Sequence, residues 1–108
     1  MHKGTTLLVP FPFTDLTGTK IRPCVLLYDQ KSGEDCIVAF ISSEKHKRLS
    51  ATDIQLKSTA ENGLKVDSVL KIDKVATLQK KIILGELGVL DATVMKKVDL
   101  HLKKIFSL

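Results

Sequence analysis

Residues 5–28 hold the feature that most restricts the fold: two apolar segments joined by a short polar one. Residues 5–13 and 21–28 are rich in aliphatic and aromatic side chains, whereas residues 14–20 are polar and contain a glycine. This pattern predicts two β-strands joined by a loop. Arg22 and Pro23 stand near the start of the second strand. Because proline has no backbone donor, this start is expected at a sheet edge or a strand end. The loop therefore brings a lysine and an arginine to the mouth of a small β structure.

Three further strands are predicted downstream. Residues 36–41 are apolar and predict a strand that is buried on both faces. Residues 53–56 predict a short strand, and a turn signal follows at residues 61–63. Residues 67–78 alternate between apolar and polar with period two, except at Lys74, where we expect a bulge or a strand end.

The clearest helix is predicted at residues 91–106. Asp91 is a good N-cap, and one apolar face is formed by Val94, Val98, Leu102 and Ile105. Residues 79–84 predict one helical turn and residues 85–88 a linker. Several short strands and one terminal helix predict a mainly β fold with some α, a small and strongly bent β-barrel. At this length we expect a single domain over residues 1–108.

The chain is basic, with 17 Lys and Arg against 12 Asp and Glu, a net charge of +5 and a pI near 9.3. A basic balance favours a polyanionic partner such as nucleic acid, although it also serves solubility alone. No apolar run approaches the ~20 residues that a bilayer span requires. The start of the chain, MHKGTTLLV, does not resemble a signal peptide.

The cysteines and histidines do not suggest a metal site or a disulfide. Cys24 and Cys36 lie inside apolar strand segments, and their spacing matches neither a CxxC motif nor a zinc pattern. We expect them to be buried free thiols in a reducing cytoplasm. His2, His46 and His101 are widely separated along the chain. No cofactor is expected.

Four segments together resemble the PemK/MazF family of toxins, which are ribosome-independent endoribonucleases. They are VPFPFTDLTGTKIRP, CIVAFISSE, GLKVDSVLKIDKVATL and the helix end LKKIF, and the resemblance covers nearly the whole chain. It implies an SH3-like barrel of the type shared with CcdB and a symmetric homodimer. It also implies metal-independent cleavage of single-stranded RNA at short sequences. The products would be a 2′,3′-cyclic phosphate and a 5′-hydroxyl, and an acidic antitoxin would occupy the RNA groove.

Arg22 is the best candidate for the cation of such a reaction. Cleavage without a metal requires removal of the 2′-hydroxyl proton, stabilisation of charge on the phosphate, and protonation of the leaving 5′ oxygen. The planar guanidinium holds two phosphate oxygens at once. The alternative is a structural arginine that pairs with Asp15 or Asp73 at the barrel mouth. The resemblance favours the catalytic role.

Three more catalytic candidates follow from the resemblance. Ser42 ends the third strand at the position where the family has an active-site Thr or Ser, although such a hydroxyl also caps turns. Lys71 and Asp73 share one face of a strand and match an Arg-x-Asp pair that acts as acid and base in some members. Asp73 is the predicted base and Lys71 its support. The alternative for this pair is a solvated ion pair of little energetic value.

Basic and polar residues of the two loops are the predicted contacts to the RNA backbone. They are Thr14, Lys20, Ser43, Lys45, Lys47 and Arg48. Phe11 and Phe13 offer either a stacking surface for a base or core packing, and we expect Phe11 to lie in the core.

Three departures from the family pattern leave open the alternative that the nuclease activity is weakened. The family's initial Gly-Asp is Gly4-Thr5 here, Lys71 replaces an arginine, and Ala76-Thr77-Leu78-Gln79 replaces Arg-Thr-Ile-Asp. Two other functions therefore remain alternatives. One is a non-catalytic barrel that binds RNA or a protein partner, and the other is a gyrase-directed toxin of the CcdB type.

Overall fold

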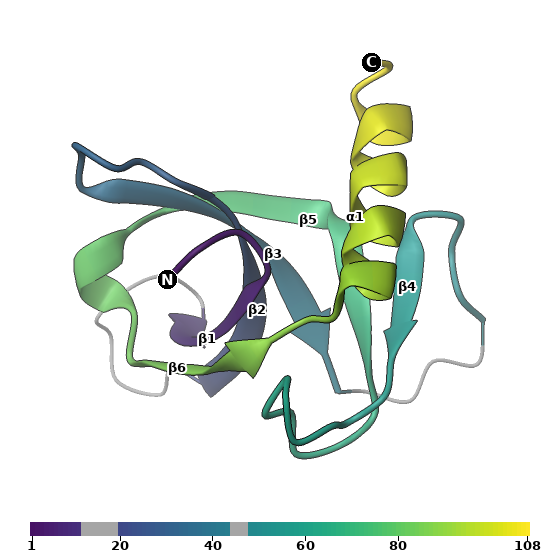
Figure 1. The fold of residues 1–108 in the computed structure, drawn as a ribbon, viewed down its shortest axis with the longest axis horizontal. Coiled ribbons are helices and arrows are strands. Elements are labelled where there is room, and N and C mark those ends of the chain that lie inside the picture. The colour runs from purple at the N-terminus through teal and green to yellow at the C-terminus, as the bar shows by residue number, and fades with distance from the viewer. Residues whose placement is uncertain (12–19, 44–47) are drawn as a thin grey trace.

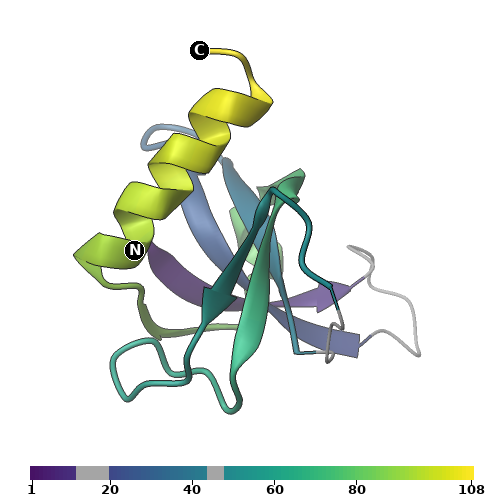
Figure 2. The same cartoon turned by 90° about the vertical axis from the view of Figure 1, so that its right-hand side faces the viewer.

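The computed structural model describes residues 1–11, 20–43 and 48–108. The elements are β1 (Thr5–Phe11), β2 (Lys20–Asp29), β3 (Asp35–Ser42), β4 (Asp53–Leu56), β5 (Ser68–Gln79), the short 3-10 helix η1 (Lys80–Ile82), β6 (Gly85–Val89) and α1 (Ala92–Ile105). The strands form one antiparallel sheet in the order β4-β5-β3-β2-β1-β6. The sheet curls into a half-barrel, and α1 stands against β4 and β5 (Figures 1 and 2). The predicted bent β structure with a C-terminal helix is confirmed.

Alternating side chains of the strands bury both faces of the sheet. In β2, Val25 belongs to one core, whereas Cys24 and Leu26 belong to the other. The helix-side core comprises Val25, Ala39, Ile41, Ile54, Leu56, Leu64, Leu70, Ile72, Leu90 and Val98. The second core comprises Leu7, Val9, Cys24, Leu26, Cys36, Val38 and Leu78. This arrangement explains why residues 21–28 and 36–41 are apolar on both faces.

The terminal helix forms as its sequence predicts. The Asp91 carboxylate accepts the backbone N–H of Val94 at 2.8 Å, which satisfies one free donor of the first turn. Val98 is fully buried in the helix-side core, and the other predicted contact residues, Val94, Leu102 and Ile105, pack against that core. Lys103 and Lys104 lie in the last turn, where positive charge is favourable.

The predicted linker at residues 85–88 is wrong, because this segment forms strand β6 and pairs with β1. Its sequence, GELG, lacks the apolar alternation that marks a strand, and the pairing comes from β1 instead. A β carbon on Gly88 would lie 2.0 Å from the carbonyl oxygen of Glu61, whereas one on Gly85 would meet nothing within 4 Å. Gly88 therefore allows β6 to pass close to the turn at residues 61–63.

The two cysteines are free and buried, as predicted. Burial, with a smaller contribution from Cys36, raises the pKa of Cys24 to about 12. Burial also raises the pKa of Cys36. Both thiols are therefore protonated at neutral pH. No helix in the described part of the chain is long and apolar enough to span a membrane.

Candidate functional site

A pocket of about 240 Å³ lies where three strands of the sheet end. Its described lining comprises Phe11, Arg22, Phe40, Ile41, Ser42 and Lys74. The strand register explains why these residues meet. Arg22 is opposite Val9, and Phe40 is opposite Cys24, so both side chains continue the face of the second core.

Backbone pairing is incomplete at this end of the sheet. β2 pairs with β1 from Lys20 onward, but its pairing with β3 begins only at Cys24. Pro23 immediately precedes this point and has no N–H to donate. The prediction of a strand edge at the proline is therefore confirmed. The early end of the β2–β3 ladder leaves Arg22 beside an open pocket rather than within a closed sheet.

Aromatic rings hold Arg22 in place. The guanidinium carbon lies 5.7 Å from the centre of the Phe11 ring, within the range of a cation–π interaction. Phe11 in turn meets Phe40 edge to face, with ring centres 5.4 Å apart. Phe11 is 39% exposed, so its expected place in the core is wrong. It forms a wall of the pocket because the second core ends at Val9.

Among the described residues, Arg22 forms no ion pair with a carboxylate. The alternative pairing with Asp73 is therefore not observed, and Asp15 lies outside the described residues. The pocket thus presents a guanidinium whose charge no described carboxylate neutralises, and Ser42 lines the same pocket.

Lys71 is the neighbour of a pocket residue, but its side chain binds a carboxylate of β4 and does not line the pocket. It is opposite Phe40 in β3 and opposite Asp53 in β4. Its ammonium donates to the Asp53 carboxylate at 3.0 Å, and the Asp53 side chain is only 1% exposed. Burial alone raises the pKa of Asp53, but hydrogen bonds from the Ser50 backbone N–H and from Lys71 outweigh it and hold the pKa below its ordinary value.

Asp73 and Lys74 lie in an irregular part of β5. Lys71 pairs with Phe40 and Val75 pairs with Ala39, so three residues of β5 intervene between adjacent residues of β3. The bulge expected at Lys74 is confirmed. Asp73 is exposed and is not among the described lining residues of the pocket, so its role as base stays a prediction. Lys74 does line the pocket, and sequence reasoning did not name it as a site residue. The break in period two was the signal for it.

The predicted RNA contacts are only partly described. Lys20, Ser43 and Arg48 are exposed, and Lys20 is directly opposite Phe11. Ser43 lines a neighbouring apolar groove of about 500 Å³. Thr14, Lys45 and Lys47 lie outside the described residues.

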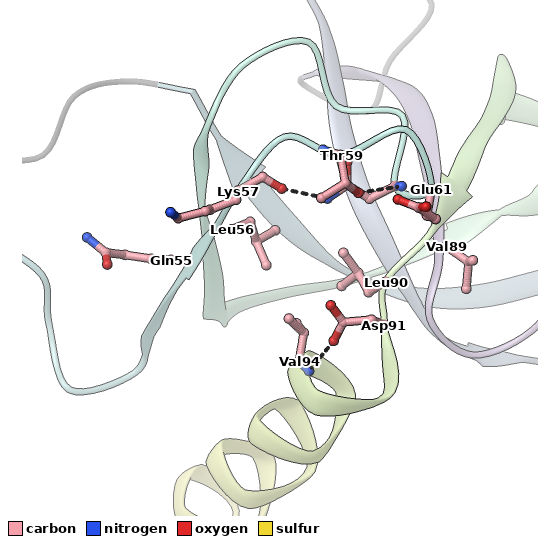
Figure 3. Close-up of a pocket in the computed structure, with 10 residues that line it drawn as sticks. Gln55, Leu56, Lys57, Thr59, Glu61, Val89, Leu90, Asp91 and Val94 are labelled. Carbon is pink, nitrogen blue, oxygen red and sulfur yellow. Dashed lines mark hydrogen bonds between the residues drawn. The ribbon is translucent and has the colours of Figure 1, made fainter.

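Another cavity, of about 440 Å³, lies between β4, the turn at residues 57–62 and the start of α1 (Figure 3). Leu56, Leu90 and Val94 face one another in it, and Asp91 uses its carboxylate to cap the helix. None of the predicted site residues lines it. Thr59 and Asn62 use their polar groups within the turn, and Asp91 uses its own at the helix start. The pocket at Arg22 is therefore the candidate site.

Comparison with known proteins identifies the family and the fold. Residues 3–106 match the family model described as "PemK-like, MazF-like toxin of type II toxin-antitoxin system". No curated protein matches the chain in sequence. Similar solved structures share its fold at low sequence identity. An endoribonuclease in complex with its cognate antitoxin, from a mycobacterial species, has a TM-score of 0.77 at 14% identity, covering 100% of this chain and 96% of that one.

Two further structures show the same likeness. An endoribonuclease from a mycobacterial species has a TM-score of 0.75 at 16% identity, with 100% of this chain and 92% of that chain covered. The Mycobacterium tuberculosis toxin MazF-mt6 has a TM-score of 0.76 at 20% identity, with 96% and 97% covered.

Proposed function

Because the chain belongs to the PemK-like, MazF-like toxins of type II toxin–antitoxin systems, we propose that it is an endoribonuclease that cleaves single-stranded RNA without a metal ion. Two proteins of similar fold are named endoribonucleases. The observation that carries the proposal is the pocket, which is lined both by an arginine without a described carboxylate partner and by a serine. A fixed cation beside a hydrogen-bonding group is what a phosphodiester requires.

In the proposed reaction the 2′ oxygen of one nucleotide forms a bond to the adjacent phosphorus while the bond to the 5′ oxygen breaks. Arg22 binds two phosphate oxygens and stabilises the charge that grows on them. Ser42 orients the phosphate, and Asp73 accepts the 2′-hydroxyl proton. The leaving 5′ oxygen takes up a proton from solvent water, and Asp73 returns the proton that it accepted to solvent, so no net proton is consumed. The products are a 2′,3′-cyclic phosphate and a 5′-hydroxyl, with Lys71 supporting the strand that carries Asp73.

The remaining surface suits a polyanion. Lys20, Ser43 and Arg48 are exposed, and we assign them to the RNA backbone together with Thr14, Lys45 and Lys47. The net charge of +5 favours RNA and an acidic antitoxin alike. A structure of similar fold is a complex with its cognate antitoxin. We propose that this chain acts as a homodimer and is neutralised in the same way.

The test is cleavage of an unstructured RNA by purified protein in the presence of a chelator. Arg22→Ala is expected to reduce the rate by about 100- to 1,000-fold, because it removes a preorganised charge from the transition state. The fold should persist, since the residue lies at the end of the β2–β3 ladder. Lys96→Ala removes one exposed positive charge from α1, across the sheet from the pocket, and serves as the control.

Equal cleavage by wild type and Arg22→Ala would remove Arg22 from the mechanism. An RNA that shifts in mobility but stays intact with wild-type protein would identify a non-catalytic RNA-binding barrel instead.

A further inference from the structure

The bulge in β5 changes the face on which Lys74 lies. Strict alternation from Ile72, a helix-side core residue, would place Lys74 on the same buried face. The register shift moves it instead into alternation with Ala76, which packs against the second core. This is the face that ends in the pocket, and Lys74 is one of its lining residues. A β-bulge commonly redirects a side chain at a functional site.

The pocket gathers two positive charges and, among its described lining residues, no negative one. Arg22 and Lys74 both line it, and neither forms an ion pair within the described part of the chain. Like charges brought together in one small pocket repel each other, which disfavours the empty arrangement. An anion that touches both groups removes this cost. The pocket is therefore complementary to a group that presents several negatively charged oxygens.

Lys71, three residues earlier, provides the contrast. Its ammonium is committed to Asp53 at 3.0 Å, and the carboxylate is almost fully buried. Moving Lys71 toward a ligand would leave that buried carboxylate without its counter-charge, which is costly. Of the two lysines, only Lys74 has a charge that no described carboxylate neutralises.

We propose that Lys74, turned into the pocket by the β5 bulge, is a second phosphate-binding cation that acts with Arg22 on the scissile phosphodiester. This inference rests on the proposed endoribonuclease function and adds a substrate-contacting residue to it. The guanidinium holds two oxygens in its fork, and the compact ammonium meets the charge that remains on the phosphate. The two cations together match the extra negative charge of the transition state.

The experiment compares Lys74→Met, Lys74→Arg and the control Lys96→Met. Cleavage of a single-stranded RNA is measured as kcat and KM. Binding of a non-cleavable 2′-O-methyl RNA is followed by fluorescence anisotropy over a range of salt concentrations. Lys74→Met is expected to lower kcat by about 100-fold, and Lys74→Arg to recover most of it. The slope of log affinity against log salt should fall by about 0.7 in Lys74→Met, because one phosphate contact is lost.

A Lys71→Met protein serves as the structural contrast, with a lower thermal midpoint and an unchanged salt slope. A Lys74→Met protein with the wild-type kcat and the wild-type salt slope would overturn the inference. A reduced salt slope in Lys71→Met together with a wild-type slope in Lys74→Met would overturn it too. A change in KM alone, with kcat unaffected, would move Lys74 to a neighbouring phosphate and refute the scissile contact. Wild-type protein that binds the 2′-O-methyl RNA but cuts no RNA refutes the proposed function. The salt slope then still decides whether Lys74 contacts phosphate.

Discussion

The ion pair between Lys71 and Asp53 gives the sharpest stability prediction. Asp53 is 1% exposed and Lys71 is 22% exposed, with 3.0 Å between the ammonium and the carboxylate. The other carboxylate oxygen of Asp53 is buried and has no hydrogen-bond partner among the residues that the structure describes. Lys71→Met removes the counter-charge but keeps most of the aliphatic stem. The variant therefore measures the free-energy cost of burying the Asp53 carboxylate without its counter-charge.

Removing one partner of a buried pair costs about 3–5 kcal/mol, because the remaining charge is left uncompensated. Two features of the structure favour the lower end. Lys71 keeps some contact with solvent, and the Ser50 backbone N–H still donates to Asp53 at 2.9 Å. We expect Lys71→Met to lose about 3 kcal/mol and to lower the thermal midpoint by about 10–20 °C. The double variant with Asp53→Asn should regain at least half of this loss, since no charge is then buried.

The pH dependence follows from the lowered pKa of Asp53. The unfolded chain takes up a proton near pH 3.8, before the folded protein does. The stabilisation is therefore complete above this pH and is lost as the pH falls through the lower pKa of the folded protein. Without Lys71, two contributions that lower the pKa of Asp53 are lost, whereas burial still acts to raise it. The stability difference between wild type and Lys71→Met should thus be largest at neutral pH and shrink below pH about 4.

The measurement is urea unfolding followed by circular dichroism at pH 7 and at pH 3.5, on wild type, Lys71→Met and the double variant. A single variant with the wild-type midpoint at pH 7 would refute the argument. So would a deficit of the same size at both pH values, because the pair would then contribute through packing and not through charge.

Three other changes test separate parts of the structure. Phe11→Ala should reduce RNA cleavage by about 5- to 30-fold by releasing the Arg22 guanidinium, whereas Phe11→Tyr should retain activity. Equal cleavage rates for the two variants would exclude a positioning role of the ring. Gly88→Ala should lower the free energy of unfolding in urea by about 1–3 kcal/mol, because its β carbon would meet a backbone oxygen at 2.0 Å. Gly85→Ala is the control and should be tolerated. Equal urea midpoints for the two variants would show that β6 shifts freely. The free energy of unfolding should fall by up to about 1.4 kcal/mol per pH unit above pH 9. The reason is that the unfolded chain loses the Cys24 proton there, whereas the folded protein keeps it to about pH 12. A Cys24→Ala variant with the same dependence on pH would assign the effect to other groups.

Much of this fold was readable because local pattern and tertiary environment agree. Asp91 begins the helix as its side chain predicts, and the strand predicted at residues 53–56 matches Asp53–Leu56. β6 was missed because its pairing depends on β1 and on the close approach at Gly88. Neither of these leaves an alternating pattern in the sequence.

The site was harder to read than the fold. Arg22 and Ser42 were found, one as a charge beside a proline and the other through the family resemblance, and the structure places them at one pocket. Both Lys71 and Lys74 are lysines on β5, so the pairing register of this strand is needed to tell which of them lines the pocket. Only the position of the bulge and the burial of Asp53 distinguish them.

Two departures from regular pairing, at Pro23 and in β5, lie beside the pocket, and their position is informative. A regular ladder satisfies every backbone donor and sends alternate side chains into a core, so it leaves no room for a charged ligand. Here Pro23 precedes the start of the β2–β3 ladder, and the β5 bulge turns Lys74 toward the pocket. Each irregularity carries a cation to the end of the second core, where Phe11 replaces aliphatic side chains. It follows that deleting Val75, which would place Lys74 opposite Ala39, should return Lys74 to the helix-side face and reduce cleavage even though every lysine and arginine is retained. Cleavage that survives such a deletion in a folded protein would show that the charges act through their number and not through their placement.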